Sequence, residues 1–208
     1  MFRLLIFIAS LSFITGVAWA QDATFETPAP HAVILDFETN TVLFEKNAQI
    51  PTAPASMTKI MTATIVFEEI RNGNISPDTE YIVSEKAWRR GGSTMFLEPG
   101  DKVRVEDLLR GVIIQSGNDA CITLAEGISG SEPAFAELMT RRGKTMGLKN
   151  AEFRNSTGWP DPEHNISTFD LAVLARHTIK EFPEFYPIYA ERSFTWACLL
   201  YTSDAADD

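Results

Sequence analysis

The sequence is poor in cysteine and histidine and has no cluster of basic residues. It contains 2 cysteines and 3 histidines in 208 residues. A disulfide framework needs several cysteines, and a metal site needs several ligands at close spacing, so neither is expected. Lys and Arg together number 18 against 28 Asp and Glu, which gives a net charge of −10. An acidic chain without a basic patch is not expected to bind nucleic acid.

Long apolar runs are also missing, except at the start of the chain. There Arg3 precedes an apolar stretch over residues 4–17, and Ala18-Trp19-Ala20 has the small-x-small form of a cleavage site. Because polar residues follow directly, the pattern predicts a signal peptide over residues 1–20 rather than an uncleaved membrane anchor. The mature protein is therefore expected to begin near Gln21 and to be secreted across the inner membrane to the periplasm or cell envelope.

The remaining sequence has enough apolar residues for one domain, at 45% of the chain. Residues 31–37 and 41–47 have the pattern of two strands joined as a hairpin, and residues 105–181 are largely helical in pattern. Strands followed by helices predict an α+β fold, with a helical lobe packed on an antiparallel sheet. A hairpin alone is not stable, so the sheet needs further strands after residue 190, and none is visible there.

Several local signals give predictions for single elements. Residues 80–86 read as a strand, and Ser131 is expected to cap the helix that follows it. Ser167 with Asp170 resembles a capping box, in which each residue's side chain binds the other's backbone N–H group. Pro183 is expected to end that last helix.

The last eleven residues, CLLYTSDAADD (198–208), differ abruptly in character from the rest. They resemble the in-frame translation of a transposase-type sequencing adapter, so residues 198–208 are expected to be a non-native tail. An ordinary acidic C-terminus is the alternative. If the tail is not native, Cys198 does not belong to the protein and Cys121 is its single cysteine, expected to be a small buried residue.

Ser56 and Lys59 are the first residues with a chemical pattern. They lie three apart at the start of an amphipathic helix, so the hydroxyl and the amine can meet on one face. A serine hydroxyl becomes a strong nucleophile only when a base takes its proton. Burial beside the positive end of a helix would lower the pKa of Lys59 and make the amine such a base. The pair by itself is a weak signal, because the spacing also arises by chance.

Ser116-Gly117-Asn118 interrupts a second helical stretch further along the chain. A glycine is costly inside a helix, so a break is expected here. The break offers a hydroxyl and a carboxamide that could reach the same cleft as Ser56. A polar turn between two buried helices is the alternative interpretation of this segment taken alone.

Ser-x-x-Lys together with Ser-x-Asn are two of the three motifs of penicillin-binding proteins and β-lactamases. The chain resembles the low-molecular-mass penicillin-binding proteins, which are serine-type D-alanyl-D-alanine carboxypeptidases. The likeness covers residues 30–197 and is strongest in the segment GGSTMFLEPGDKVRVEDLLRGVIIQSGNDACITLAE. Residues 21–197 are accordingly expected to be a partial catalytic domain of this family.

The resemblance implies a role for each residue of the two motifs. Ser56 would be the nucleophile that forms an acyl ester, and Lys59 its proton acceptor. Ser116 would relay the proton to the leaving amine, and Asn118 would bind the amide backbone of the substrate. The substrate would be a peptidoglycan stem peptide ending in D-Ala-D-Ala, with β-lactams as inhibitors and with no metal or organic cofactor.

The third motif of the family, Lys-Thr-Gly on a sheet strand, is missing from this chain. Lys144-Thr145 is followed by Met146 and reads as the solvated end of a helix. The chain as given is therefore expected to be inactive and to lack the C-terminal sheet strands. In the family, a second β domain and an amphipathic membrane anchor often follow, so any contact with a membrane would come from there.

Two rival functions remain open. Residues 161–165 resemble the loop by which class A β-lactamases position a water, with Glu163 as the carboxylate. A catalytically silent cell-wall-binding protein is the rival from another class, although intact motifs argue against it. His164 with Asp161 could suggest a Ser-His-Asp triad, but no Gly-x-Ser-x-Gly elbow accompanies them, so a solvated loop histidine is expected.

Overall fold

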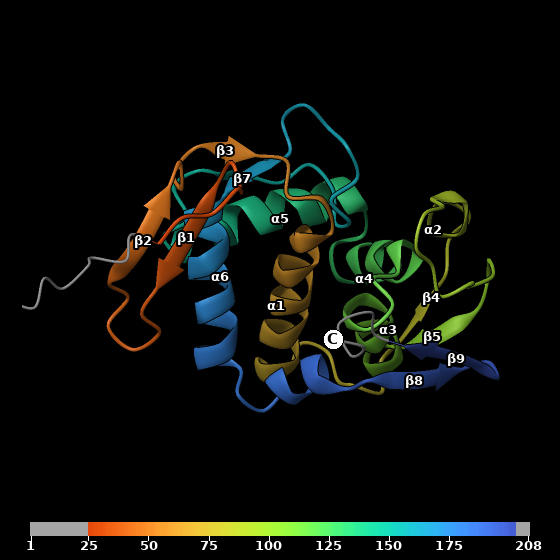
Figure 1. Cartoon of the computed structure of the whole chain (residues 1–208). Helices are drawn as coiled ribbons and strands as arrows, with labels where there is room; N and C mark the ends of the chain where they lie inside the picture. Colours follow the sequence, from red (N-terminus) through yellow and green to blue (C-terminus); the bar gives the residue numbers. More distant parts are fainter. Residues whose placement is uncertain (1–24, 203–208) are drawn as a thin grey trace, which may run out of the picture.

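The computed structural model describes residues 25–202. The expected signal peptide, and the end of the expected tail after residue 202, lie outside this range. Strands and helices of the described part form an α+β arrangement around one central helix. Figure 1 shows that helix, α1 (Thr58–Arg71), between α6 (Thr168–Glu181) on one side and α3 (Val105–Ile113) and α4 (Asn118–Ser129) on the other.

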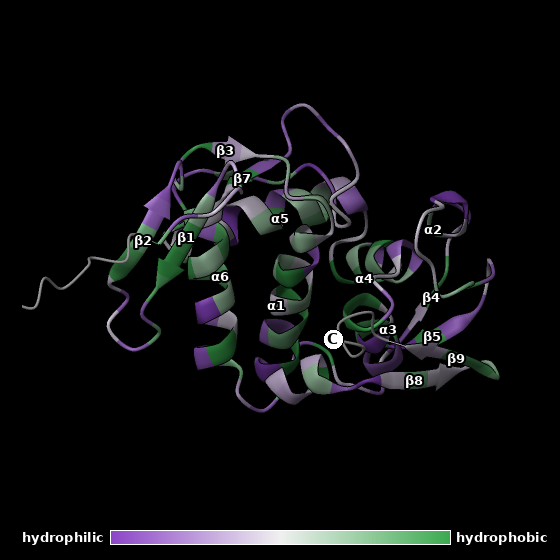
Figure 2. Ribbon diagram, in the orientation of Figure 1, coloured by the Kyte–Doolittle hydropathy of each residue, from purple (hydrophilic) through white to green (hydrophobic). Residues whose placement is uncertain are grey.

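Helix α1 is the core element of the fold. Met61, Ala63, Ile65, Val66 and Phe67 along it are all fully buried. Its threonines also lie inside, and each uses its hydroxyl group; for example, Thr62 donates to the Ser156 carbonyl at 2.7 Å. Because buried polar groups need partners, these bonds fix the position of the helix against its neighbours. Figure 2 shows that apolar residues line the inward faces of the helices around α1.

Helix α5 (Glu132–Thr145) packs across the end of α1 near its N-terminus (Figure 1). The Ser131 hydroxyl caps α5 by accepting from the Ala134 N–H group, and the Ser167 hydroxyl caps α6 by accepting from the Asp170 N–H group. Both N-caps agree with the sequence, because serine oxygens satisfy the free N–H groups of a first helical turn. The capping box is nevertheless wrong: the Asp170 carboxylate accepts from the Asn150 N–H group, on the neighbouring loop, instead of the Ser167 N–H group.

The strands of the described residues form four small antiparallel sheets. The hairpin predicted from the sequence is confirmed as β1 (Ala32–Leu35) and β2 (Val42–Lys46), and it packs beside α6. A three-stranded sheet has the order β3 (Pro51–Thr52), β7 (Asn165–Ser167), β6 (Ala151–Glu152). The other two sheets pair β4 (Glu80–Ile82) with β5 (Lys102–Arg104), and β8 (Ser193–Trp196) with β9 (Leu199–Thr202).

Two predictions about strands need correction. The strand expected over residues 80–86 ends at Ile82, because Ser84 accepts from the Ala87 N–H group and starts a short helix, α2 (Glu85–Arg89). Strands are also present after residue 190, contrary to expectation. They pair with each other and not with the β1–β2 hairpin, which has no third strand within residues 25–202. A short 3₁₀ helix, η2 (Tyr186–Ala190), precedes them.

Candidate active site

Ser56 lies in a tight turn just before α1 and not in the α-helix itself. The turn is a 3₁₀ helix, η1 (Ala55–Met57), and the α-helix begins at Thr58. Side chains three residues apart eclipse one another in 3₁₀ geometry, which directs Ser56 toward Lys59. The Lys59 Nζ atom lies 3.2 Å from the Ser56 Oγ atom. The predicted meeting of these two side chains is therefore observed.

Lys59 is only 6% exposed. Burial lowers the pKa of its amine, since a charged ammonium loses water solvation there, while the nearby Asp119 carboxylate acts in the opposite direction. Burial also raises the pKa of the Cys121 thiol to about 12, so this residue is uncharged at neutral pH and behaves as the small buried side chain expected from the sequence. The lowered pKa makes Lys59 a more available proton acceptor than a surface lysine.

Ser116 approaches Lys59 from the opposite wall. Its Oγ atom accepts from the Lys59 Nζ atom at 3.1 Å, so one amine contacts two serine hydroxyls. Ser116 lies in the gap between α3 and α4 with a φ of 57°, and Ala55, next to Ser56, has a φ of 48°. Non-glycine residues in this left-handed region cost about 1–3 kcal/mol, and such strain tends to occur at functional sites. Here it occurs on both sides of the same amine.

Asn118 is the first residue of α4 and is largely buried. Its side-chain Nδ2 atom donates to the Gly91 carbonyl at 2.9 Å, and its backbone N–H group donates to the Ser93 carbonyl at 2.7 Å. Gly92, with φ +74°, allows this approach, because a Cβ atom there would lie 2.8 Å from the Asn118 Nδ2 atom. Trp159 lies on the same rim, 3.5 Å from that Cβ position. Asn118 is thus held at the wall of the site by the loop after α2.

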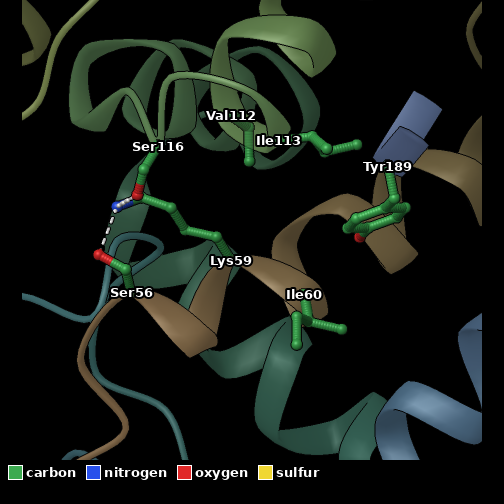
Figure 3. Close-up of a pocket in the computed structure, with 7 residues that line it drawn as sticks. All are labelled: Ser56, Lys59, Ile60, Val112, Ile113, Ser116 and Tyr189. Atoms are coloured by element: carbon green, nitrogen blue, oxygen red, sulfur yellow. Dashed lines mark hydrogen bonds between the residues drawn. The ribbon is translucent and has the colours of Figure 1, made fainter. Parts of the chain in front are cut away.

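Figure 3 shows the cavity formed between these two walls, with the Lys59 amine between the two serine hydroxyls. The cavity has a volume of about 120 Å³. Besides the two serines and the lysine, it is lined by Ile60, Val112, Ile113 and Tyr189. Tyr189, on η2, was not predicted from the sequence, since no local pattern links an aromatic residue there to Ser56 and Lys59, far earlier in the chain. Burial raises the pKa of its hydroxyl, which keeps that group protonated.

Other residues considered from the sequence lie away from this cavity. Lys144 and Thr145 are exposed in the last turn of α5, as expected for a solvated helix end. Glu163 is exposed and forms a 3.3 Å ion pair with Arg154. The prediction for His164 is wrong, because this residue is 3% exposed and hydrogen-bonded at both ring nitrogens. No group of three or more potential metal ligands is found within residues 25–202.

The sequence matches one known protein family over most of its length. The family described as D-alanyl-D-alanine carboxypeptidase matches residues 17–206. The chain belongs to this family. It is 40% identical over 181 residues to the D-alanyl-D-alanine carboxypeptidase DacF of Bacillus subtilis, a match that covers 85% of this chain and 46% of the relative. It is also 40% identical to DacD of Escherichia coli, over 92% of this chain and 51% of the relative.

Solved structures of the carboxypeptidase family share the fold. The D-alanyl-D-alanine carboxypeptidase DacD of Francisella tularensis superposes with a TM-score of 0.83 at 42% identity, covering 88% of this chain and 45% of that structure. Penicillin binding protein 5 of Haemophilus influenzae gives a TM-score of 0.81 at 37% identity, covering 84% and 52%. The expected α+β, DD-peptidase-like fold is confirmed. The chain spans about half the length of the curated relatives it matches.

Proposed function

We propose that the protein containing this chain is a serine-type D-Ala-D-Ala carboxypeptidase, in which Ser56 is the nucleophile. The observation that carries the proposal is the Lys59 amine, buried and within 3.2 Å of the Ser56 and Ser116 hydroxyls. A neutral amine in this place can take the Ser56 proton. Membership of the carboxypeptidase family supports the choice of substrate.

In the proposed reaction, the Ser56 Oγ atom attacks the carbonyl carbon of the penultimate D-Ala residue while Lys59 takes its proton. The resulting oxyanion is stabilised by backbone N–H groups of the complete site. Ser116 then passes a proton to the nitrogen of the terminal D-Ala, which leaves. Water hydrolyses the acyl-Ser56 ester and regenerates the hydroxyl. Asn118 would hold the peptide backbone, and the chemistry requires no cofactor.

The substrate class is the stem peptide of peptidoglycan, which carries a D-Ala-D-Ala end. Two solved relatives are named penicillin binding proteins 5 and 6B, which supports the further proposal that β-lactams acylate Ser56. A substrate of this kind requires a protein outside the cytoplasm, in agreement with the signal peptide expected over residues 1–20. Within residues 25–202, no helix is both long and apolar enough to cross a membrane.

The two rival functions have less support. Glu163 would be the water-activating carboxylate of a class A β-lactamase, yet it is exposed and paired with Arg154. Burying an amine costs stability. A silent cell-wall-binding protein would gain nothing from a buried amine between two hydroxyls that offsets this cost.

Peptide hydrolysis separates the carboxypeptidase from the β-lactamase. The complete native protein should release D-Ala from a peptide ending in D-Ala-D-Ala, as measured by a coupled assay for free D-alanine, and should release bound penicillin slowly. Rapid turnover of penicillin without release of D-alanine would contradict the proposal and favour the β-lactamase. Failure of both reactions in a folded protein would favour the silent cell-wall-binding protein.

A further inference from the structure

His164 is hydrogen-bonded to Thr58, the first residue of α1, and has no place in the reaction described above. It comes from the loop between β6 and β7, far from Ser56 in the sequence, yet its ring is 3% exposed and packs edge-on against the Phe153 ring. The His164 Nε2 atom lies 2.9 Å from the Thr58 Oγ1 atom. A buried histidine bonded to the residue that starts α1 joins the loop to the element that carries Ser56.

The hydrogen bonds of His164 assign its protons. The Arg154 backbone N–H group donates to the His164 Nδ1 atom at 3.1 Å. A backbone N–H group can only donate, so Nδ1 carries no proton and the ring is the neutral tautomer with its proton on Nε2. That Nε2–H group therefore donates to the Thr58 hydroxyl oxygen.

The same loop touches the turn of Ser56 at a second point. Gly158 has a φ of +80°, and a Cβ atom there would lie 1.8 Å from the Ala55 carbonyl oxygen and 2.8 Å from the Thr58 Oγ1 atom. The loop backbone thus lies directly against the residue before Ser56, in a position that a larger side chain would block. Ala55 itself has a left-handed φ of 48°. Such a conformation persists only where the surroundings fix it, and Gly158 and Thr58 are its neighbours here.

We propose that His164 is a positioning residue for Ser56, acting through Thr58 and the loop to hold the turn Ala55–Met57 in its strained, reactive conformation. The inference rests on the proposed function, since it concerns the acylation of Ser56. His164 does not touch the reacting atoms. Its loss should slow acylation about 10-fold or more, because small displacements of a nucleophile are costly in rate.

In the wild-type protein, lowering the pH should slow the acylation of Ser56 by protonating His164. Protonation would place a second proton on Nδ1, facing the Arg154 N–H group, and the bond would be lost. Burial lowers the pKa of His164, the Asp161 carboxylate raises it, and the Arg154 guanidinium, which is paired with Glu163, lowers it further. A pKa below the ordinary value of about 6.5 means that the neutral ring is favoured by folding. His164 therefore holds the turn Ala55–Met57 fully at pH values above about 6.5, and this hold is lost as the pH falls through the lowered pKa of His164.

The test compares acylation rates by a fluorescent penicillin for the complete wild-type protein and for His164→Gln and His164→Ala, from about pH 8 to about pH 4. The Gln amide can still donate to Thr58 but does not titrate, so we expect most of the rate at neutral pH to return in His164→Gln. The ratio of the wild-type rate to the His164→Gln rate should be constant at neutral pH and fall in acid. Titration of Lys59 affects both proteins equally and cancels in this ratio. His31→Gln, just before β1 and outside the cavity lining, is the matched control and should behave as wild type.

A second pair of variants keeps the test decisive if His164→Ala does not fold. Thr58→Ser retains the acceptor oxygen and should keep the acylation rate, whereas Thr58→Val has nearly the same shape without it and should lose about as much as His164→Ala. Wild-type rates and an unchanged pH profile in folded His164→Ala, or in Thr58→Val, would overturn the inference while leaving the proposed function intact. Absence of acylation in wild type would overturn both.

Discussion

Lys59 is the residue on which the proposed reaction depends most. Its amine is buried and has two hydroxyl partners, and its lowered pKa shifts it toward the neutral form. The sign of the shift matters. Because burial disfavours the charged amine, Lys59 costs stability at neutral pH and gains in reactivity as pH rises through its lowered pKa. Such an exchange of stability for activity is expected at an active site and not in an ordinary core.

Replacing Lys59 by arginine tests whether it acts as a base. Arginine keeps the positive charge but cannot lose its proton, so Lys59→Arg should slow acylation by penicillin nearly as much as Lys59→Ala, by about 10² to 10⁴-fold. Stopped-flow fluorescence across neutral and alkaline pH measures the rates. The wild-type rate should rise with pH below the ordinary lysine pKa, and both variants should stay low and flat. Near-normal rates in Lys59→Arg would reduce Lys59 to an electrostatic partner.

At the scale of elements, a buried glutamate joins α2, α5 and the loop that carries His164. Glu132 Oε2 accepts from Lys86 Nζ at 2.8 Å and from Arg90 Nη2 at 2.9 Å, while its Oε1 atom accepts from the Ser156 hydroxyl at 3.0 Å. Burial raises the pKa of Glu132, but the bonds to Lys86 and Arg90 outweigh it and hold the pKa below the ordinary value. The α2 and α5 helices and the loop are therefore held together by one charged group.

Glu132→Gln should lower the free energy of unfolding of the complete protein by about 3 kcal/mol. Breaking a buried ion pair costs about 3–5 kcal/mol, and the lower value is expected here because Lys86 is partly exposed. Urea unfolding measures this change. The wild-type advantage should be present above the ordinary glutamate pKa of about 4.3 and be lost as pH falls through the lowered pKa in the folded protein. Glu137→Gln, on the exposed face of the same helix, is the control and should change stability little. Equal effects of the two substitutions would contradict the structural role of Glu132.

The sequence predicted elements well where local signals decide them. The serine caps at Ser131 and Ser167 and the break at Ser116 all depend on groups within a few residues, so they could be read directly. Ser84 followed by Glu85 is also a local signal for the start of α2, but the strand-like residues just before it hide where the strand ends. Burial of His164 could not be predicted, because it results from a contact with Thr58 across the fold. The partner of Asp170 likewise depends on a loop distant in sequence.

At the scale of the molecule, the β1–β2 hairpin is the incomplete part of the described fold. Within residues 25–202 it pairs with no other strand, and Leu43 and Val42 on it are exposed at 65% and 40%. An open strand edge with apolar side chains favours association with other chains. We expect a strand that carries the Lys-Thr-Gly motif to pair with this hairpin in the complete protein and to form the wall of the site opposite Ser56.

Residues 21–208 expressed alone should therefore be acylated at least about 100-fold more slowly than the complete native protein. We expect the absent strand to supply one hydrogen-bond donor of the oxyanion hole, and losing one such donor slows a reaction by about 100-fold or more. The chain should also unfold at a lower temperature and associate at its open edge. Penicillin labelling, thermal unfolding and size-exclusion chromatography measure these three effects. A monomer with a cooperative transition and stoichiometric labelling at the rate of the complete protein would show that further strands are dispensable.

The role of Ser56 as nucleophile is best tested by the mass of the complete protein after incubation with penicillin. Wild type should gain the mass of one penicillin molecule, carried by a peptide that contains Ser56, and Ser56→Ala should gain none. Ser76→Ala, on an exposed loop, should be labelled like wild type and excludes a general effect of removing a serine. An adduct on Ser56→Ala, or on any other residue of wild type, would contradict the assignment of Ser56 as the nucleophile.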